Sequence, residues 1–151
     1  MTEKFQIINA SAGSGKTFSL ASNVIMKLLS ADEDSYKKIL ALTFTNNSAN
    51  EMKNRILDEL SQISKDPSKS IIYQETKLKS LFKEQQISKK ATKVLNKILH
   101  NFSFFQISTI DKFNHRLIRS FSNDMSLSSD FDLIIESDEF SENLALEFIE
   151  G

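Results

Sequence analysis

The sequence predicts an α/β protein in which helices flank a parallel β-sheet. Short apolar runs of strand length alternate along the chain with longer segments whose apolar residues recur at helical spacing, a pattern typical of strand–helix–strand units. Small or polar residues follow the apolar runs directly, at the position where such sheets bind ligands. Of the 151 residues, 40% are hydrophobic and 26% are charged, so we expect a globular domain with a sizeable core.

The first half of the chain is expected to contain two strands and two helices. Residues 5–9 form a short apolar run and predict a buried strand. Apolar residues recur at helical spacing over residues 17–29 and again over residues 49–63, which predicts two amphipathic helices. Between them, residues 38–44 predict a second buried strand, and the polar residues 45–48 provide side chains that can cap the next helix.

The second half is expected to be mostly helical, with one more strand. Pro67, the only proline, lies in the polar stretch 64–70 and marks a break in the chain. Two lysine-rich helices are predicted beyond it, at about residues 71–85 and 88–101. The apolar run 104–108 then predicts a third strand, which leads into another helix.

Apolar residues around the third strand and in the helix after it are expected to point into the core. They are Phe102, Phe104, Phe105, Phe113, Leu117 and Phe121. Residues 1–122 are expected to form the amino-terminal part of one domain, with a lysine-rich helical insert at about residues 65–101. Because the composition then turns acidic and serine-rich, residues 123–151 are expected to begin a helical accessory subdomain.

The net charge of −1 conceals an uneven distribution along the chain. Residues 65–100 carry nine lysines against three acidic residues, whereas residues 123–151 carry nine acidic residues and no basic one. This asymmetry indicates two surfaces with different neighbours. For the lysines, a solvated helix face is the favoured interpretation, and a path for DNA is the alternative.

The composition makes several kinds of site and protein class unexpected. Without cysteine the chain has neither a disulfide nor a thiolate metal site, and its two histidines, His100 and His115, are too far apart in sequence to predict a zinc site. No apolar run approaches the roughly 18 residues of a transmembrane helix, and the first residues do not resemble a secretory signal. We therefore expect a cytoplasmic protein with no membrane partner.

The most specific motif fits the phosphate-loop pattern of nucleotide-binding proteins. It consists of Ala10, Ser11, Ala12, Gly13, Ser14, Gly15, Lys16 and Thr17. Small residues allow backbone N–H groups to surround phosphate oxygens, and the following helix presents its positive end. Lys16 is expected to reach the β- and γ-phosphates of ATP, and the Thr17 hydroxyl to hold Mg²⁺. A glycine turn with an exposed lysine is the alternative.

Two further segments place polar side chains directly after predicted strands. Phe44, Thr45 and Asn46 follow the second strand, and residues 109–113 follow the third. An exposed phenylalanine there could stack on a base while its polar neighbours hold a phosphate. Taken alone, however, each segment is better explained by a helix cap beside a core phenylalanine.

Together, and in this order, the three segments resemble motifs I, Ia and Ib of the UvrD/RecB family of superfamily 1 DNA helicases. The most specific part is Thr43-Phe44-Thr45-Asn46 followed by Ala49, Glu51-Met52-Lys53 and Arg55. The resemblance covers residues 7–119, and Ser11 and the long insert are closer to the RecB/AddA branch than to UvrD. It implies a RecA-like phosphate-loop domain, here incomplete, from an enzyme that uses ATP to translocate along single-stranded DNA.

The resemblance also implies roles for matching residues. Residues 10–17 would bind ATP and magnesium, with catalytic roles for Lys16 and Thr17. The residues expected to contact single-stranded DNA are Phe44, Thr45, Asn46, Thr109, Asp111 and Phe113. The sequence departs from the family pattern at Asn47, where a basic residue is usual, and at Asp111-Lys112, which replaces the usual His-Ser and places a carboxylate at an expected DNA contact.

The expected parent is an ATP-dependent DNA helicase or helicase–nuclease of recombinational repair, completed by further helicase domains and possible partner subunits. The 151 residues alone are not expected to hydrolyse ATP efficiently, because they contain no recognisable magnesium-binding carboxylate motif and no late arginine motif. The alternatives are another phosphate-loop enzyme, a non-catalytic DNA-binding module, and a structural fragment that binds nothing.

Overall fold

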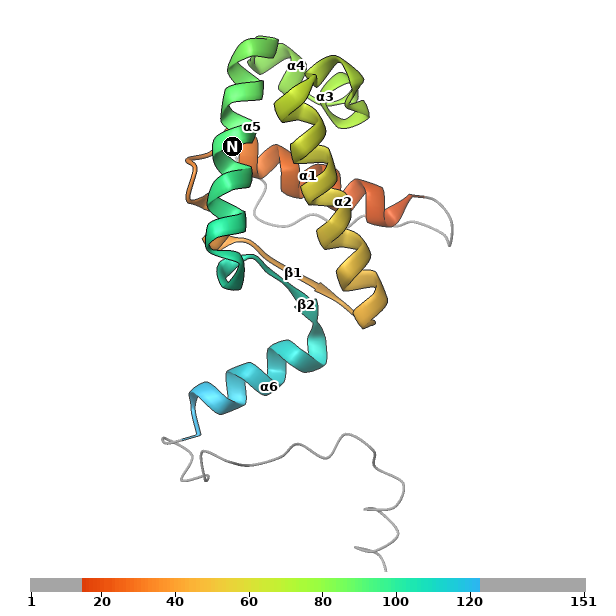
Figure 1. Cartoon of the computed structure of the whole chain (residues 1–151). Helices are drawn as coiled ribbons and strands as arrows, with labels where there is room; N and C mark the ends of the chain where they lie inside the picture. Colours follow the sequence, from red (N-terminus) through yellow and green to blue (C-terminus); the bar gives the residue numbers. More distant parts are fainter. Residues whose placement is uncertain (1–14, 123–151) are drawn as a thin grey trace, which may run out of the picture. The chain divides into compact units, whose positions relative to one another are not determined.

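The computed structural model of the chain describes residues 15–122 (Figure 1). These residues belong to two compact units that divide between Ile110 and Asp111. The first unit holds most of the described helices and both strands, and the second holds a single described helix.

The elements of the first unit begin with helix α1 (Lys16–Ser30), the short 3₁₀ helix η1 (Ser35–Lys38) and strand β1 (Leu40–Thr43). A long helical segment follows, made of α2 (Asn46–Lys65), η2 (Pro67–Lys69), α3 (Ile71–Glu75), α4 (Leu78–Leu81) and α5 (Glu84–His100). The unit ends with η3 (Phe102–Phe104) and strand β2 (Gln106–Thr109), and helix α6 (Ile110–Ser120) comes after it.

The two strands pair in parallel, which confirms the predicted parallel sheet within the described residues. The register runs from Leu40 opposite Gln106 to Thr43 opposite Thr109. Both strands therefore end at the same edge of the sheet. The strand predicted at residues 5–9 lies outside the described residues, so the structure describes a helix-rich α/β arrangement with a two-stranded parallel sheet.

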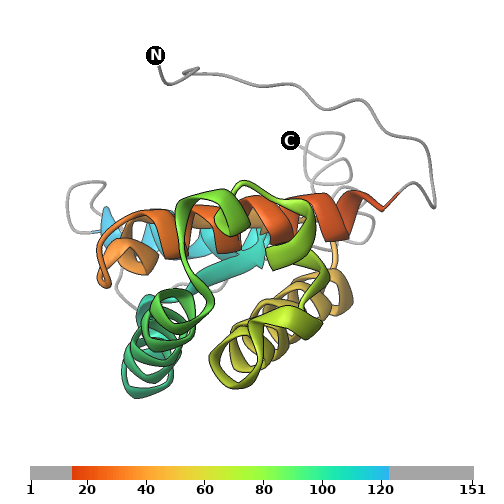
Figure 2. The same ribbon diagram turned by 90° about the horizontal axis from the view of Figure 1, so that it is seen from above.

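The core lies between three helices, α1, α2 and α5. Seen from above, α1 lies across one side of the pair formed by α2 and α5 (Figure 2). The buried residues recur every three or four positions, as the sequence predicts for amphipathic helices. They include Ala21, Ile25, Leu28 and Leu29 of α1, Met52, Ile56, Leu60 and Ile63 of α2, and Ile87, Ala91, Val94 and Ile98 of α5.

Strand β1 is less buried than predicted. Leu40 is 47% exposed and Leu42 is 38% exposed, whereas Ala41 packs against the core on the other face of the strand. Side chains alternate between the two faces of a strand, and within the described residues the helices cover only the face that Ala41 shares with Ile107. The prediction of a buried strand over residues 38–44 is therefore wrong for the face that carries Leu40 and Leu42.

The helix predicted over residues 71–85 is broken into α3 and α4. Ser70 accepts a hydrogen bond from the Tyr73 N–H (3.1 Å) and so caps the start of α3. Thr76 ends α3 with extended backbone (φ −108°, ψ 171°), and its Oγ1 accepts from the N–H of Leu78 (3.4 Å). Local bonds of this kind from serine and threonine compete with helix continuation, which explains the break.

Helix α5 begins four residues earlier than the predicted start at residue 88. The Gln86 side chain accepts a hydrogen bond from the backbone N–H of Lys83 (3.2 Å), which satisfies a donor just ahead of the first turn. Glu84 lies in that first turn, where a negative charge interacts favourably with the helix dipole. These two interactions extend the helix beyond its apolar pattern.

Several aromatic residues that were expected in the core are exposed. Phe102 and Phe104 lie in η3 with exposed rings, and only Phe105, next to β2, is buried. The tight 3₁₀ turn points successive side chains in different directions, so they cannot all reach one core. The ammonium of Lys53 lies 5.8 Å from the ring centre of Phe102, and that of Lys37 lies 5.8 Å from the ring centre of Phe104.

Helix α6, which makes up most of the described part of the second unit, buries none of its residues. Leu117 and Phe121 are exposed and Phe113 is half-buried, so the prediction that they point into the core is wrong for the described residues. Within its own unit, α6 has no second described helix or strand against which to pack.

None of the described helices is long and apolar enough to cross a membrane.

The packing of α5 makes a direct test of the core possible. Ile98 is completely buried, while the next residue, Leu99, is exposed. We expect Ile98→Ala to lower the free energy of unfolding by about 2–5 kcal/mol, because it removes buried methyl groups and leaves a cavity. Leu99→Ala is the matched control and should change it by less than about 0.5 kcal/mol. Urea denaturation of both variants measures the difference, and equal effects would contradict the assigned face of α5.

Candidate nucleotide and DNA-contact sites

The start of α1 carries the described part of the phosphate-loop motif. Gly15 precedes the helix with a left-handed backbone (φ 77°, ψ 26°), a conformation that favours glycine over residues with a Cβ atom. Nothing lies within 4 Å of the position that a Cβ would occupy, so the backbone angle rather than space calls for glycine. Lys16 is exposed and Thr17 is half-buried in the first turn. Residues 10–14 lie outside the described residues.

The chemistry of this helix start fits an anionic ligand. Gly15 has no side chain with which to cap α1, and the first turn of α1 contains no acidic residue that would compete with an anion. The first N–H groups of a helix and its dipole attract negative charge, and Lys16 adds a full positive charge. The buried side chains of Ala21 and Ile25 fix the rest of α1 against the core. These features suit phosphate binding by Lys16 and a metal-binding role for the Thr17 hydroxyl.

The second candidate site lies where β1 ends and α2 begins. Thr45 caps α2: its Oγ1 accepts a hydrogen bond from the N–H of Ser48 (3.1 Å) and donates one to Oγ of Ser48 (2.8 Å). Thr43 Oγ1 donates to the carbonyl oxygen of Thr45 (3.0 Å), which closes the turn between strand and helix. The turn leaves Phe44 86% exposed, with Asn46 exposed beside it. The alternative in which Phe44 is a core residue is therefore wrong.

The structure brings some, but not all, of the expected DNA-contact residues together. Thr109 ends β2 opposite Thr43, so it lies at the same sheet edge as Phe44, Thr45 and Asn46. Its side chain is buried, at 4% exposure, whereas those of the other three are open to solvent. The sheet edge thus presents an exposed aromatic ring beside two polar side chains, an arrangement that can stack on a base and hold a phosphate.

Asp111 and Phe113 belong to the second unit. Asp111 is exposed in the first turn of α6, where a carboxylate stabilises the helix through its dipole. Phe113 is half-buried. This first-turn position is a structural explanation for the acidic residue that is independent of DNA.

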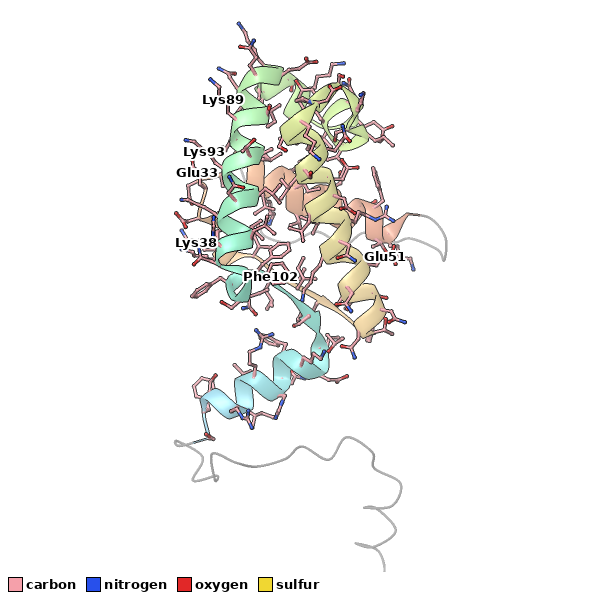
Figure 3. All side chains as sticks on the ribbon, in the orientation of Figure 1. Glu33, Lys38, Glu51, Lys89, Lys93 and Phe102 are labelled. Carbon is pink, nitrogen blue, oxygen red and sulfur yellow. The ribbon has the colours of Figure 1, made fainter. Side chains whose placement is uncertain are left out.

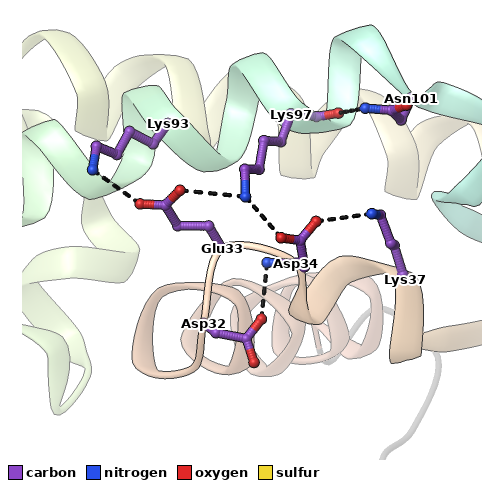
Figure 4. A network of polar contacts seen from close by, with 7 residues as sticks. All are labelled: Asp32, Glu33, Asp34, Lys37, Lys93, Lys97 and Asn101. Atoms are coloured by element: carbon purple, nitrogen blue, oxygen red, sulfur yellow. Dashed lines mark hydrogen bonds and ion pairs between the residues drawn. The ribbon is translucent and has the colours of Figure 1, made fainter.

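A third, charged cluster joins the turn after α1 to helix α5 (Figure 4). Glu33 forms ion pairs with Lys93 (3.1 Å) and Lys97 (3.4 Å). Asp34 pairs with Lys97 (2.7 Å) and Lys37 (2.9 Å). The sequence alone favours a solvated face for the lysines of α5. It does not predict these ion pairs, because the partners lie some sixty residues away in the chain and no local pattern connects them.

The ion pairs keep this cluster charged. Hydrogen bonds from Lys97 and then from Lys37 lower the pKa of Asp34 from 3.8 to about 2. A hydrogen bond from Lys93 lowers the pKa of Glu33 in the same way, and the bond to Asp34 raises the pKa of Lys97. Opposite charges favour the ionised forms of Asp34, Glu33 and Lys97.

The cap at Thr45 can be tested separately from ligand binding. We expect Thr45→Ala to lower the free energy of unfolding by about 1 kcal/mol, because the N–H of Ser48 loses its acceptor at the start of α2. Asn47→Ala, at an exposed position in the same turn, is the control and should have little effect. Thermal unfolding followed by circular dichroism compares the two, and an unchanged Thr45→Ala protein would refute the cap.

Comparisons with known proteins agree with the motifs. Residues 1–150 match the family model described as the UvrD/REP helicase N-terminal domain. No solved structure was found to match the chain.

Curated relatives match shorter or longer parts of the chain. The RecB subunit of the RecBCD enzyme of Chlamydia muridarum is 35% identical over 107 residues, which cover 71% of this chain and 10% of that protein. An ATP-dependent helicase/nuclease subunit of Staphylococcus haemolyticus is 45% identical over 58 residues, or 38% of this chain and 5% of that protein. The protein of the same description from Lactococcus lactis is 27% identical over 133 residues, or 88% and 9%. The chain thus spans a tenth or less of the length of these three relatives.

With a family model matched along nearly its whole length, the chain belongs to the UvrD/REP helicase N-terminal domain family.

Proposed function

We propose that this chain is the ATP-binding portion of an ATP-dependent DNA helicase or translocase that moves along single-stranded DNA in recombination and repair. The observation that carries the proposal is the turn between β1 and α2, where a capped helix start leaves Phe44 almost fully exposed. A buried phenylalanine would have explained the same sequence by packing alone. Family membership and the helix start at Lys16 support the same proposal.

For the nucleotide, the residues of α1 have distinct tasks. The Lys16 ammonium would bind the terminal phosphates of ATP, and the N–H groups of the first turn would orient them. The Thr17 hydroxyl would be a ligand of Mg²⁺, which when bound neutralises phosphate charge. The left-handed backbone of Gly15, which precedes these groups directly, favours glycine at this position.

For DNA, the sheet edge supplies contacts that do not depend on base identity. Every base has a π-face that can stack on Phe44, and the polar groups of Thr45, Asn46 and the first turn of α2 can position the adjacent phosphate. Buried Thr109 would support this edge from β2. Asp111 and Phe113, which belong to the second unit, are separately proposed to contact single-stranded DNA.

The parent protein would include further helicase domains. The relatives from Chlamydia muridarum and Staphylococcus haemolyticus are themselves subunits, which supports a partner subunit for the parent too. We propose that the 151 residues bind nucleotide without efficient turnover, since the groups that stabilise the transition state of phosphoryl transfer would come from outside them. The cytoplasm is the proposed location.

Nucleotide binding is tested by replacing Lys16. A fluorescent ATP analogue with magnesium should bind the chain, and Lys16→Ala should reduce its affinity by at least tenfold, because the terminal phosphates lose their positive partner. Lys27→Ala, an exposed lysine in the last turn of the same helix, is the matched control and should bind as the unchanged chain does. Equal affinities for all three proteins would refute the phosphate site.

The DNA contact is tested by replacing Phe44. Stacking on one base is worth roughly 1–3 kcal/mol, so Phe44→Ala should weaken binding of a single-stranded oligonucleotide about tenfold or more. The melting temperature should stay the same because the ring is exposed. Leu81→Ala is the control, since it removes a large exposed side chain from α4, which is not part of the sheet edge.

Anisotropy with a labelled oligonucleotide and a melting curve should be measured for both variants. A lower melting temperature with unchanged DNA affinity in Phe44→Ala would refute the DNA contact. The same loss of affinity in both variants would show that any exposed apolar side chain suffices and that the strand end is not the site.

A further inference from the structure

Helix α5 carries a stripe of lysines on one side. Lys89, Lys93 and Lys97 are four residues apart, so they share one face of the helix at intervals of about 6 Å along its axis. Figure 3 shows Lys89 and Lys93 along the same outer side of α5, with Glu33 beside Lys93. The only acidic residue of α5 is Glu84, in its first turn. This face therefore has the regular positive charge that suits a chain of phosphates.

The acidic turn after α1, defined as Asp32, Glu33 and Asp34, lies against this stripe. One open groove is lined by the acidic turn on one side and by Lys89, Lys90, Lys93 and Lys97 on the other. The carboxylates hold Lys93 and Lys97 through the ion pairs given above. They occupy the positions that phosphate oxygens would take on the same lysines.

Another anion can take the place of the acidic turn on the lysine stripe. The paired side chains remain between 33% and 66% exposed, and ion pairs in such surroundings contribute little to stability and are screened by salt. Lys89 is exposed and forms no ion pair with any residue in the described part of the chain. A ligand could therefore first contact Lys89 and then displace the carboxylates from Lys93 and Lys97.

We propose that the lysine stripe of α5 binds the phosphate backbone of single-stranded DNA, and that the acidic turn competes with DNA for Lys93 and Lys97. The choice of DNA as the occupant rests on the proposed function, together with the charge of the stripe. Lysine is a point charge that holds phosphate without reading sequence, which suits a strand that must pass the protein at every base. The acidic turn would keep the stripe closed to weaker anions.

The competition can be measured with a labelled oligothymidine and the 151-residue chain over a range of salt concentrations. Glu33→Gln with Asp34→Asn frees Lys93 and Lys97 of the stripe, and also Lys37, and should tighten binding several-fold. The control, Asp58→Asn with Glu75→Gln, changes the net charge equally at exposed residues of α2 and α3. It should tighten binding much less. If the two double variants gain equally, only net charge matters and the proposed competition is refuted.

The stripe itself is tested by Lys89→Gln with Lys93→Gln. Loss of two phosphate contacts should weaken binding and reduce the slope of log K against log salt by about 1.4, at about 0.7 for each contact with a single strand. Lys27→Gln with Lys77→Gln removes two exposed lysines elsewhere and should leave the slope nearly unchanged. Circular dichroism confirms that each variant is folded. Equal slopes in the two variants would refute the stripe as a DNA contact.

Two further comparisons separate this inference from the proposed function. Failure of Phe44→Ala to weaken binding would remove the strand-end contact while leaving the effects of the stripe variants intact. Polyglutamate should bind the Glu33→Gln, Asp34→Asn protein far more weakly than oligothymidine of equal charge does. Equal binding would show a surface for acidic protein segments and would overturn the assignment to DNA.

Discussion

The parallel pairing of β1 with β2 depends on the burial of α2 against α5. Parallel strands cannot be joined by a tight turn, because the chain must return to the starting end of the sheet before it can pair. Here residues 44–105 make that return, and their helices are held together by fully buried side chains such as Ile56 of α2 and Ile98 of α5. The common edge at which both strands end is a consequence of this packing. The exposed position of Phe44 therefore depends on contacts far from it in the core.

Two kinds of surface chemistry result from this arrangement. The strand end offers an aromatic ring and neutral polar groups, whose attraction for nucleic acid changes little with salt. The groove beside α5 is made of full charges of both signs, and its interactions are screened as the salt concentration rises. A protein that uses both surfaces would keep part of its affinity over a wide range of ionic strength. Because only the charged groove responds strongly to salt, measuring DNA affinity at several salt concentrations would separate its contribution from that of the strand end.

Much of the fold could be predicted from the sequence wherever the pattern was long and regular. Helices α1 and α2 follow from apolar residues at helical spacing and from the cap at Thr45, and the sheet was correctly expected to be parallel. The break at Thr76 could not be predicted in this way, since it depends on individual side chains that bond to their own backbone. The exposure of Leu42 depends on which face of the sheet other elements cover, and an apolar run does not carry that information. The same limit applies to the candidate sites, where the motif located Phe44 but the pairing of Asp34 with Lys97 required the folded chain.

Helix α1 connects the candidate phosphate site at Lys16 to the acidic turn. Its first residue is Lys16, and the acidic turn begins two residues beyond its last residue, Ser30. Fifteen residues of α-helix span about 22 Å, and a helix whose buried face is packed against its neighbours moves as a rigid rod rather than bending. Because α1 packs against both α2 and α5, a displacement along its axis would require those core contacts to shift together. The proposed phosphate-binding end and the acidic turn that contacts α5 are thus held at a fixed separation by one packed helix.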